Sequence, residues 1–166
     1  MLLIVFGLPG AGKTYVGKLL KDEFGFYFYD GDRDLTDEMR QALKEKKLFN
    51  DSMRDVFFQN LKIRLLQLHK TKKQLVVAQT FIKEKYRNQL LKALPYAIFI
   101  LVQTKTALRE RRLLQRNDLD QDYVKNMVKL FEKPTIEHFQ IANDADGKIQ
   151  VMKKLKKILG NQKINN

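Results

Sequence analysis

Cysteine, long apolar runs and linker-like segments are all missing from this chain of 166 residues, and each absence narrows its class. Without cysteine there are no disulfides and no metal sites with thiolate ligands. No apolar run approaches the roughly 18 residues that a membrane span needs. Since no Pro- or Gly-rich linker divides the sequence, we expect one domain over residues 1–166. Met1 leads straight into an apolar strand pattern and not into a signal peptide, so we expect a cytoplasmic protein.

Acidic residues are also scarce relative to basic ones. The chain has 32 Lys and Arg against 19 Asp and Glu, which gives a formal net charge of +13. Such a balance favours anionic partners, and nucleic acid is one of them. Basic faces of predicted helices, such as Lys153 and Lys154, are equally well explained by solvation, and an enzyme that handles phosphates needs positive potential around its cleft. Nucleic-acid binding therefore stays an alternative to a small-molecule partner, in a monomer or a homodimer.

Short apolar runs alternate with helical patterns along the whole chain. We expect five strands, at residues 2–6, 27–29, 75–79, 97–102 and 138–142. Amphipathic stripes between and after them predict helices: Phe57, Leu61, Leu65 and Leu68; Tyr86, Leu90, Leu91 and Leu94; Val151, Leu155, Ile158 and Leu159. This alternation predicts an α/β protein, a three-layer sandwich with a five-stranded, mostly parallel sheet and helices on both faces. In such folds, ligands bind at the carboxyl ends of the strands.

The most specific motif, GLPGAGKT, follows directly on the first predicted strand. It matches the G-x-x-x-x-G-K-[ST] pattern of a phosphate-binding P-loop, with a strand before it and a helix after it. Glycines allow successive backbone N–H groups to point at phosphate oxygens. Lys13 is expected to contact the β and γ phosphates of ATP, and Thr14 to bind Mg²⁺. The whole loop is therefore predicted to bind ATP: Gly7, Leu8, Pro9, Gly10, Ala11, Gly12, Lys13 and Thr14.

Two carboxylates, Asp30 and Asp32, follow the second predicted strand and are separated by one glycine. Their mutual repulsion would be relieved by a metal ion or by a substrate hydroxyl. Asp30 is predicted to hold Mg²⁺ beside Thr14. Asp32 is predicted to accept the proton of an attacking hydroxyl. The alternative is a tight turn with solvated carboxylates.

Two absent motifs narrow the class of nucleotide-binding protein. The third strand ends at Gln79 and Thr80, without the acidic residue of a usual Walker B segment. This argues against a motor-type ATPase. The segment after the fourth strand, residues 103–106, lacks the Asn-Lys-x-Asp motif with which GTPases recognise guanine. This argues against a GTPase.

Four arginines lie within eight residues after the fourth strand: Arg109, Arg111, Arg112 and Arg116. Guanidinium groups can clamp phosphates and stabilise transition-state charge. A helix-breaking stretch follows them, so residues 109–122 are predicted to form a short lid over the nucleotide. Arg112 and Arg116 share a helix face and are the predicted catalytic pair. The alternative is a basic helix face exposed to water.

Together these segments resemble the small-molecule kinases typified by gluconate kinase and shikimate kinase. Beyond the P-loop and the two aspartates, four segments carry the resemblance: LFNDSMR (48–54), IKEKYR (82–87), RLLQR (112–116) and EKP (132–134). The resemblance spans residues 2 to about 135. The chain departs from gluconate kinases at Leu35-Thr36, where they carry a histidine, at Gln79-Thr80-Phe81, where they carry small residues, and in a shorter lid.

The resemblance implies transfer of the γ-phosphate of ATP to a hydroxyl of a small, polar, anionic metabolite, with a gluconate-like sugar acid as the first expectation. It places Arg54, Lys83 and Arg87 on the acceptor and Pro134 near the adenine. A polynucleotide 5′-hydroxyl kinase is the alternative enzyme, since residues 131–135 and the positive charge also suit that group. A nucleotide-binding switch without transfer activity is the alternative outside the enzymes.

Overall fold

A five-stranded sheet forms the centre of the computed structural model, which describes residues 1–115, 121–144 and 147–164. Its strands are β1 (Leu2–Phe6), β2 (Tyr27–Asp30), β3 (Leu75–Ala78), β4 (Ala97–Gln103) and β5 (Phe139–Ala142). They lie in the order β2-β3-β1-β4-β5, and every neighbouring pair is parallel. The α/β class and the five strands are confirmed, with strand ends that differ from the predicted ones by one residue at most.

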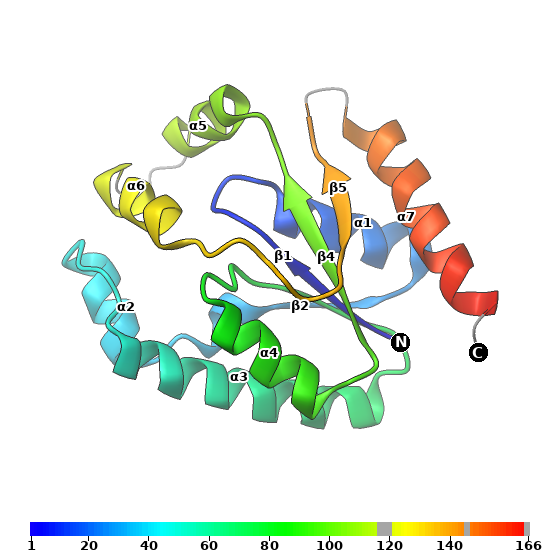
Figure 1. Cartoon of the computed structure of the whole chain (residues 1–166), viewed down its shortest axis with the longest axis horizontal. Helices are drawn as coiled ribbons and strands as arrows, with labels where there is room; N and C mark the ends of the chain where they lie inside the picture. The colour runs from blue at the N-terminus through cyan, green and yellow to red at the C-terminus, as the bar shows by residue number, and fades with distance from the viewer. Residues whose placement is uncertain (116–120, 145–146, 165–166) are drawn as a thin grey trace.

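Helices connect the strands and cover both faces of the sheet (Figure 1). They are α1 (Lys13–Phe24), α2 (Asp37–Lys44), α3 (Asp51–Thr71), α4 (Glu84–Ala93), α5 (Thr106–Leu114), α6 (Gln121–Leu130) and α7 (Gly147–Ile164), with a short 3₁₀ helix η1 (Gly31–Asp34) after β2. Side-chain caps mark two of the starts: Thr36 accepts a hydrogen bond from the Met39 backbone N–H, and Asn50 from that of Met53.

Alternate residues of the central strand β1 supply two separate cores, because successive side chains of a strand point to opposite faces. Leu2, Ile4 and Phe6 pack with α3 and α4 on one face. Leu3 and Val5 pack with α1 and α7 on the other. All five are fully buried, so the sheet is covered on both sides as an all-parallel sheet requires.

The remaining helices lie at the carboxyl ends of the strands. Figure 1 shows α2, α5 and α6 beyond that end of the sheet, on the left of the view. Among the described residues, no helix is both long and apolar enough to cross a membrane. The fold thus places the P-loop, both aspartates and the arginine-rich helix at one end of the molecule.

Candidate active site

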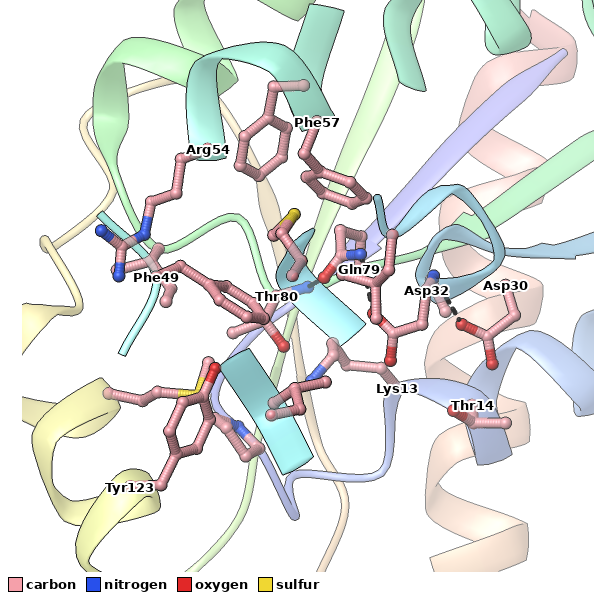
Figure 2. A pocket seen from close by; sticks show the side chains of 18 of the residues that line it. Lys13, Thr14, Asp30, Asp32, Phe49, Arg54, Phe57, Gln79, Thr80 and Tyr123 are labelled. Atoms are coloured by element: carbon pink, nitrogen blue, oxygen red, sulfur yellow. Dashed lines mark hydrogen bonds between the residues drawn. The ribbon is translucent and has the colours of Figure 1, made fainter. Parts of the chain in front are cut away.

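A cavity of about 420 Å³ opens at the carboxyl ends of β1, β2 and β3. The P-loop forms its floor through Gly10, Lys13 and Thr14, and the two aspartates form one side. Arg54 stands on the opposite side, at the start of α3 (Figure 2). The cavity thus brings P-loop residues and both aspartates, which were predicted to act on the nucleotide, the metal or the hydroxyl, together with Arg54, which was predicted to hold the acceptor.

The P-loop has the open, curled backbone that the motif predicts. Gly10 and Gly12 have φ angles of 78° and 96°, in the left-handed region that side chains disfavour. Gly12 is the N-cap of α1, and no side chain caps that helix start. Backbone N–H groups at an uncapped helix start form an anion site, reinforced by the helix dipole. The ammonium of Lys13 donates to the Leu8 carbonyl at 3.0 Å, so it is folded over the loop itself.

Asn143, which directly follows β5, holds the P-loop through a side-chain hydrogen bond. Its side-chain amide donates to the carbonyl of Ala11 at 2.9 Å, and its exposed fraction is only 3%. A Cβ on Gly12 would lie 1.9 Å from that amide nitrogen. The glycine is therefore needed for close approach as well as for its φ angle.

Helix α5 lies against the P-loop and carries Arg112 to it. A Cβ on Gly10 would be 2.9 Å from the Leu113 side chain, which shows how closely the helix approaches. Arg112 Nη2 donates to the Asn143 carbonyl at 3.1 Å. Its Nη1 is buried, has no hydrogen-bond partner among the described residues, and lies 3.7 Å from the Cβ position of Gly12. An unpartnered guanidinium nitrogen beside a phosphate loop fits a bound phosphate.

The other predicted lid arginine, Arg116, lies outside the described residues, as do residues 117–120 of the predicted lid. The lid over residues 109–122 therefore stays a prediction; its described parts belong to α5 and to the start of α6. Arg109 of α5, which the sequence argument left aside, is in fact 8% exposed and has a buried Nη1 without a partner among the described residues.

Asp32 and Gln79 form the polar centre of the cavity. The amide nitrogen of Gln79 donates to Asp32 Oδ1 at 2.9 Å, while its amide oxygen accepts from the Thr80 backbone. The amide thus holds one carboxylate oxygen of Asp32 in place (Figure 2). Gln79 occupies the strand end where a Walker B segment would carry an acidic residue. Its hydrogen bond orients Asp32, and the sequence analysis did not predict this contact.

Thr14 and Asp30 fit a magnesium ion that is also bound by phosphates. Both line the cavity beside Lys13, and Asp30 Oδ1 accepts the backbone N–H of Asp32 at 3.1 Å, which fixes the carboxylate. No cluster of three or more His, Asp or Glu residues exists among the described residues. Since Mg²⁺ is usually bound by one or two protein oxygens together with substrate phosphates and water, this sparse donor set is sufficient.

A second cavity, of about 370 Å³, lies on the other side of the P-loop. Leu8 and Ala11 of the loop line it together with Arg109, Pro134 and the end of β4. Pro134 is the residue predicted to lie near the adenine. A flat, partly apolar space beside a P-loop, with a guanidinium on its wall, has the character of a base-binding site.

Arg54 is buried at the far side of the first cavity. Its side chain is 8% exposed, and its Nη1 lies 3.5 Å from Asp51 Oδ1, while its Nε is buried without a hydrogen-bond partner among the described residues. Tyr123 of α6 also lines the cavity. Burial raises the pKa of Tyr123 to about 12, against the lowering effect of nearby Arg54 and with a raising effect from Asp32. The phenol therefore keeps its proton at neutral pH.

Lys83 and Arg87, expected to hold the acceptor, take a different place. Arg87 is fully buried, and it donates to the carbonyls of Phe81 and Glu132 at 2.7 Å each and to the Glu84 carboxylate. Lys83 pairs with Glu132 at 3.2 Å. Neither residue lines the first cavity. Their role on the acceptor stays a prediction, and in the described structure their charges are paired within the fold.

Glu84 completes this network and secures the loop that carries Pro134. One carboxylate oxygen accepts from the backbone N–H and hydroxyl of Thr135 and from the backbone N–H of Ile136. Burial by itself would raise the pKa of Glu84, but the bonds from Thr135, Arg87 and Ile136 outweigh it and lower the pKa. The sequence showed only an EKP segment near a predicted adenine site, and Glu84, 51 residues before Thr135, left no local signal there.

A parallel sheet in this order, with a P-loop after β1 and an acidic pair after β2, defines a P-loop kinase. The chain belongs to the shikimate kinase family, whose model matches residues 9–159. The family and the relatives below make it a small-molecule kinase.

Proteins with other names are also similar to this chain in sequence or in fold. A "Probable gluconokinase" of Xenopus tropicalis is 24% identical over 169 residues, covering 92% of this chain and 89% of that protein. The crystal structure of a gluconokinase from Sinorhizobium meliloti 1021 matches with a TM-score of 0.79 and 20% identity, over 99% of this chain and 96% of that one. Kti12 of Chaetomium thermophilum in complex with ADP-AlF3 matches with a TM-score of 0.67 and 18% identity, over 96% and 98%.

Proposed function

We propose that this protein transfers the γ-phosphate of ATP to a hydroxyl group of a small carboxylic acid. The observation that carries the proposal is the first cavity, in which the P-loop, Asp32 and the buried guanidinium of Arg54 face one space. The P-loop supplies a donor site, Asp32 a proton acceptor, and Arg54 a partner for a carboxylate. Because the relatives are named as gluconokinases, a gluconate-like sugar acid is the first acceptor to test.

The residues divide the chemistry as follows. Asp32 accepts the proton of the acceptor hydroxyl as its oxygen attacks the γ phosphorus, and the bond from that phosphorus to the bridging oxygen of ADP breaks in line. Lys13 and Arg112 offset the charge on the phosphates. Gln79 keeps Asp32 oriented through its 2.9 Å hydrogen bond. Magnesium, held by Thr14 and Asp30, would supply further charge neutralisation.

The nucleotide is proposed to lie across the loop, with its phosphates on residues 7–14 and its base in the second cavity. Arg109 and Pro134 face that cavity together. Arg109 offers its buried Nη1, which has no hydrogen-bond partner in the part of the chain that the structure describes. Kti12, which is similar in fold, has been solved in complex with ADP-AlF3, and this supports the proposal that the fold binds a nucleotide.

The replacement Asp32→Asn tests the proposal, with the exposed Asp22→Asn as the matched control. Loss of the base should lower kcat by about 10²–10⁴-fold with ATP affinity almost unchanged, whereas Asp22→Asn should behave as the wild type. The measurement is ADP release with a panel of hydroxy acids, alongside calorimetric binding of ATP. Wild-type turnover in Asp32→Asn, or ATP consumption that needs no acceptor, would contradict the proposal.

A further inference from the structure

The wall between the donor site and Arg54 is apolar. Six side chains from a single stretch of chain form most of it: Leu35, Met39, Leu43, Phe49, Phe57 and Phe58. Met39 and Phe57 are 2% and 3% exposed and belong to the core cluster on that face of the sheet. Figure 2 shows Phe49 and Phe57 between Arg54 on one side and Asp32 on the other. A ligand that spans the cavity therefore lies against hydrocarbon for most of its length.

Apart from the hydroxyl of Thr80, which also lines the cavity, few polar groups remain for the middle of such a ligand. The side-chain amide of Gln79 already uses its nitrogen to donate to Asp32 and its oxygen to accept from the Thr80 backbone. Asp32 is the proposed base, and Lys13 and Thr14 face the phosphates. A sugar acid would bring several further hydroxyls to this wall, and a buried hydroxyl without a partner is unfavourable.

The far end of the cavity has one buried positive charge, on Arg54, which can pair with one negative charge of a ligand. Arg54 is 6% exposed as a whole residue, and its Nε is the buried nitrogen without a partner among the described residues. Its pairing with Asp51 is long, at 3.5 Å, and Asp51 itself is 70% exposed. Tyr123, which is 5% exposed, lines the same cavity and keeps its proton at neutral pH. A carboxylate can take the guanidinium of Arg54 as its charged donor here.

We infer that the first cavity takes a carboxylic acid with an apolar body, a ring or a compact hydrocarbon, and with few hydroxyls besides the one presented to Asp32. The carboxylate lies on Arg54 and the apolar body on the wall of six side chains. This inference rests on the proposed function for the fate of that hydroxyl, while the binding of the acid itself does not depend on it.

A panel of acids separates the possibilities. Para-(hydroxymethyl)benzoate has an apolar ring and one hydroxyl, gluconate is an open-chain polyol, and shikimate is a ring with three hydroxyls. Para-methylbenzoate cannot be phosphorylated and reports binding alone. We expect para-(hydroxymethyl)benzoate to exceed gluconate in kcat/KM by about tenfold or more, and para-methylbenzoate to bind, by calorimetry with ADP present, and to compete with it.

A variant pair checks that the wall is responsible. Leu43→Gln places an amide on the wall at nearly constant volume, and glutamine is a residue that helices accept well. The variant should shift the preference from the apolar acid toward the polyol. Leu48→Gln is the control, because Leu48 is 40% exposed and does not line the cavity. A preference that shifts equally in both variants would contradict the role of the wall.

The outcomes separate this inference from the proposed function. Higher kcat/KM with gluconate or shikimate overturns the inference and leaves the proposed function standing. Binding of para-methylbenzoate that is lost in Arg54→Met supports the inference, and if no acid in the panel is then phosphorylated, the proposed function is contradicted. Absence of para-methylbenzoate binding while ATP binds normally overturns the inference.

Discussion

The side-chain amide of Asn143 donates a 2.9 Å hydrogen bond to the backbone carbonyl of Ala11, which lies 132 residues earlier in the chain. The backbone carbonyl of the same asparagine accepts from Arg112 Nη2 and from the Thr104 hydroxyl. One residue at the end of β5 thus joins the P-loop, helix α5 and the loop after β4. The shape of the donor site depends on this contact.

The first prediction follows from that contact. Asn143→Ala removes a buried hydrogen bond worth about 1 kcal/mol, so the P-loop loses its support at Ala11, while the backbone carbonyl that binds Arg112 remains. We expect the Kd for ATP to rise by about five- to tenfold, measured by calorimetry. Asn88→Ala, on an exposed face of α4, is the control. A lower melting temperature with unchanged ATP affinity would show that Asn143 supports the fold alone.

Two glycine replacements test the curled backbone of the P-loop. Gly12→Ala places a methyl group 1.9 Å from the Asn143 amide nitrogen at a φ of 96°, so we expect ATP binding to be lost. Gly160→Ala meets nothing within 4 Å in helix α7. It should raise the free energy of unfolding by about 0.5 kcal/mol. Normal ATP binding in Gly12→Ala would refute the close approach.

Two buried arginines should respond differently to the same replacement. Arg87→Met leaves Glu84 without its guanidinium partner inside the fold, so the free energy of unfolding should fall by about 3 kcal/mol or more. Arg54→Met should instead raise KM for the acceptor while stability changes less. Denaturant unfolding and acceptor titration measure the two effects. A raised acceptor KM in Arg87→Met at unchanged stability would support its predicted substrate role.

Stability should depend on pH through Glu84. Its pKa is lowered in the folded protein, against burial, by bonds from Thr135, Arg87 and Ile136. A depressed pKa contributes stability that is fully present above the ordinary value of 4.5 and is lost as the pH falls through the folded value. Unfolding free energies of wild type and Glu84→Gln should therefore differ at neutral pH and converge in acid.

Glu110→Gln, on an exposed face of α5, is the control for that comparison. It should show the same stability as the wild type over the whole pH range. A difference between wild type and Glu84→Gln that grows as the pH falls would contradict the proposed role of the carboxylate.

Much of the fold could be predicted because its signals are local. The run at residues 2–6 is fully buried on both faces, and an unbroken apolar pattern is what a central parallel strand requires. The P-loop could be predicted equally well, since its motif and the elements on either side of it lie close together in the sequence. The weakest strand, β5, begins one residue later than predicted, at Phe139, where an edge position leaves a mixed pattern.

The parts of the site that escaped prediction depend on distant contacts. Arg87 lies next to a segment similar to gluconate kinases, yet its partners at Phe81 and Glu132 take it into the interior. Asn143 and Gln79 stand at strand ends, where the fold rule directs attention, but nothing in their neighbourhood shows that they reach Ala11 and Asp32. Burial of a charged or amide side chain follows from packing between elements, which sequence spacing does not encode.

The six apolar wall side chains all come from residues 35–58, between β2 and β3, while the groups around the P-loop come from α5 and from the loops after β4 and β5. Most of the apolar wall for the acceptor is therefore encoded in one stretch of chain, to which Gln79 and Tyr123 add from elsewhere. Exchange of residues 35–58 between related kinases should change that wall and leave the groups around the P-loop in place.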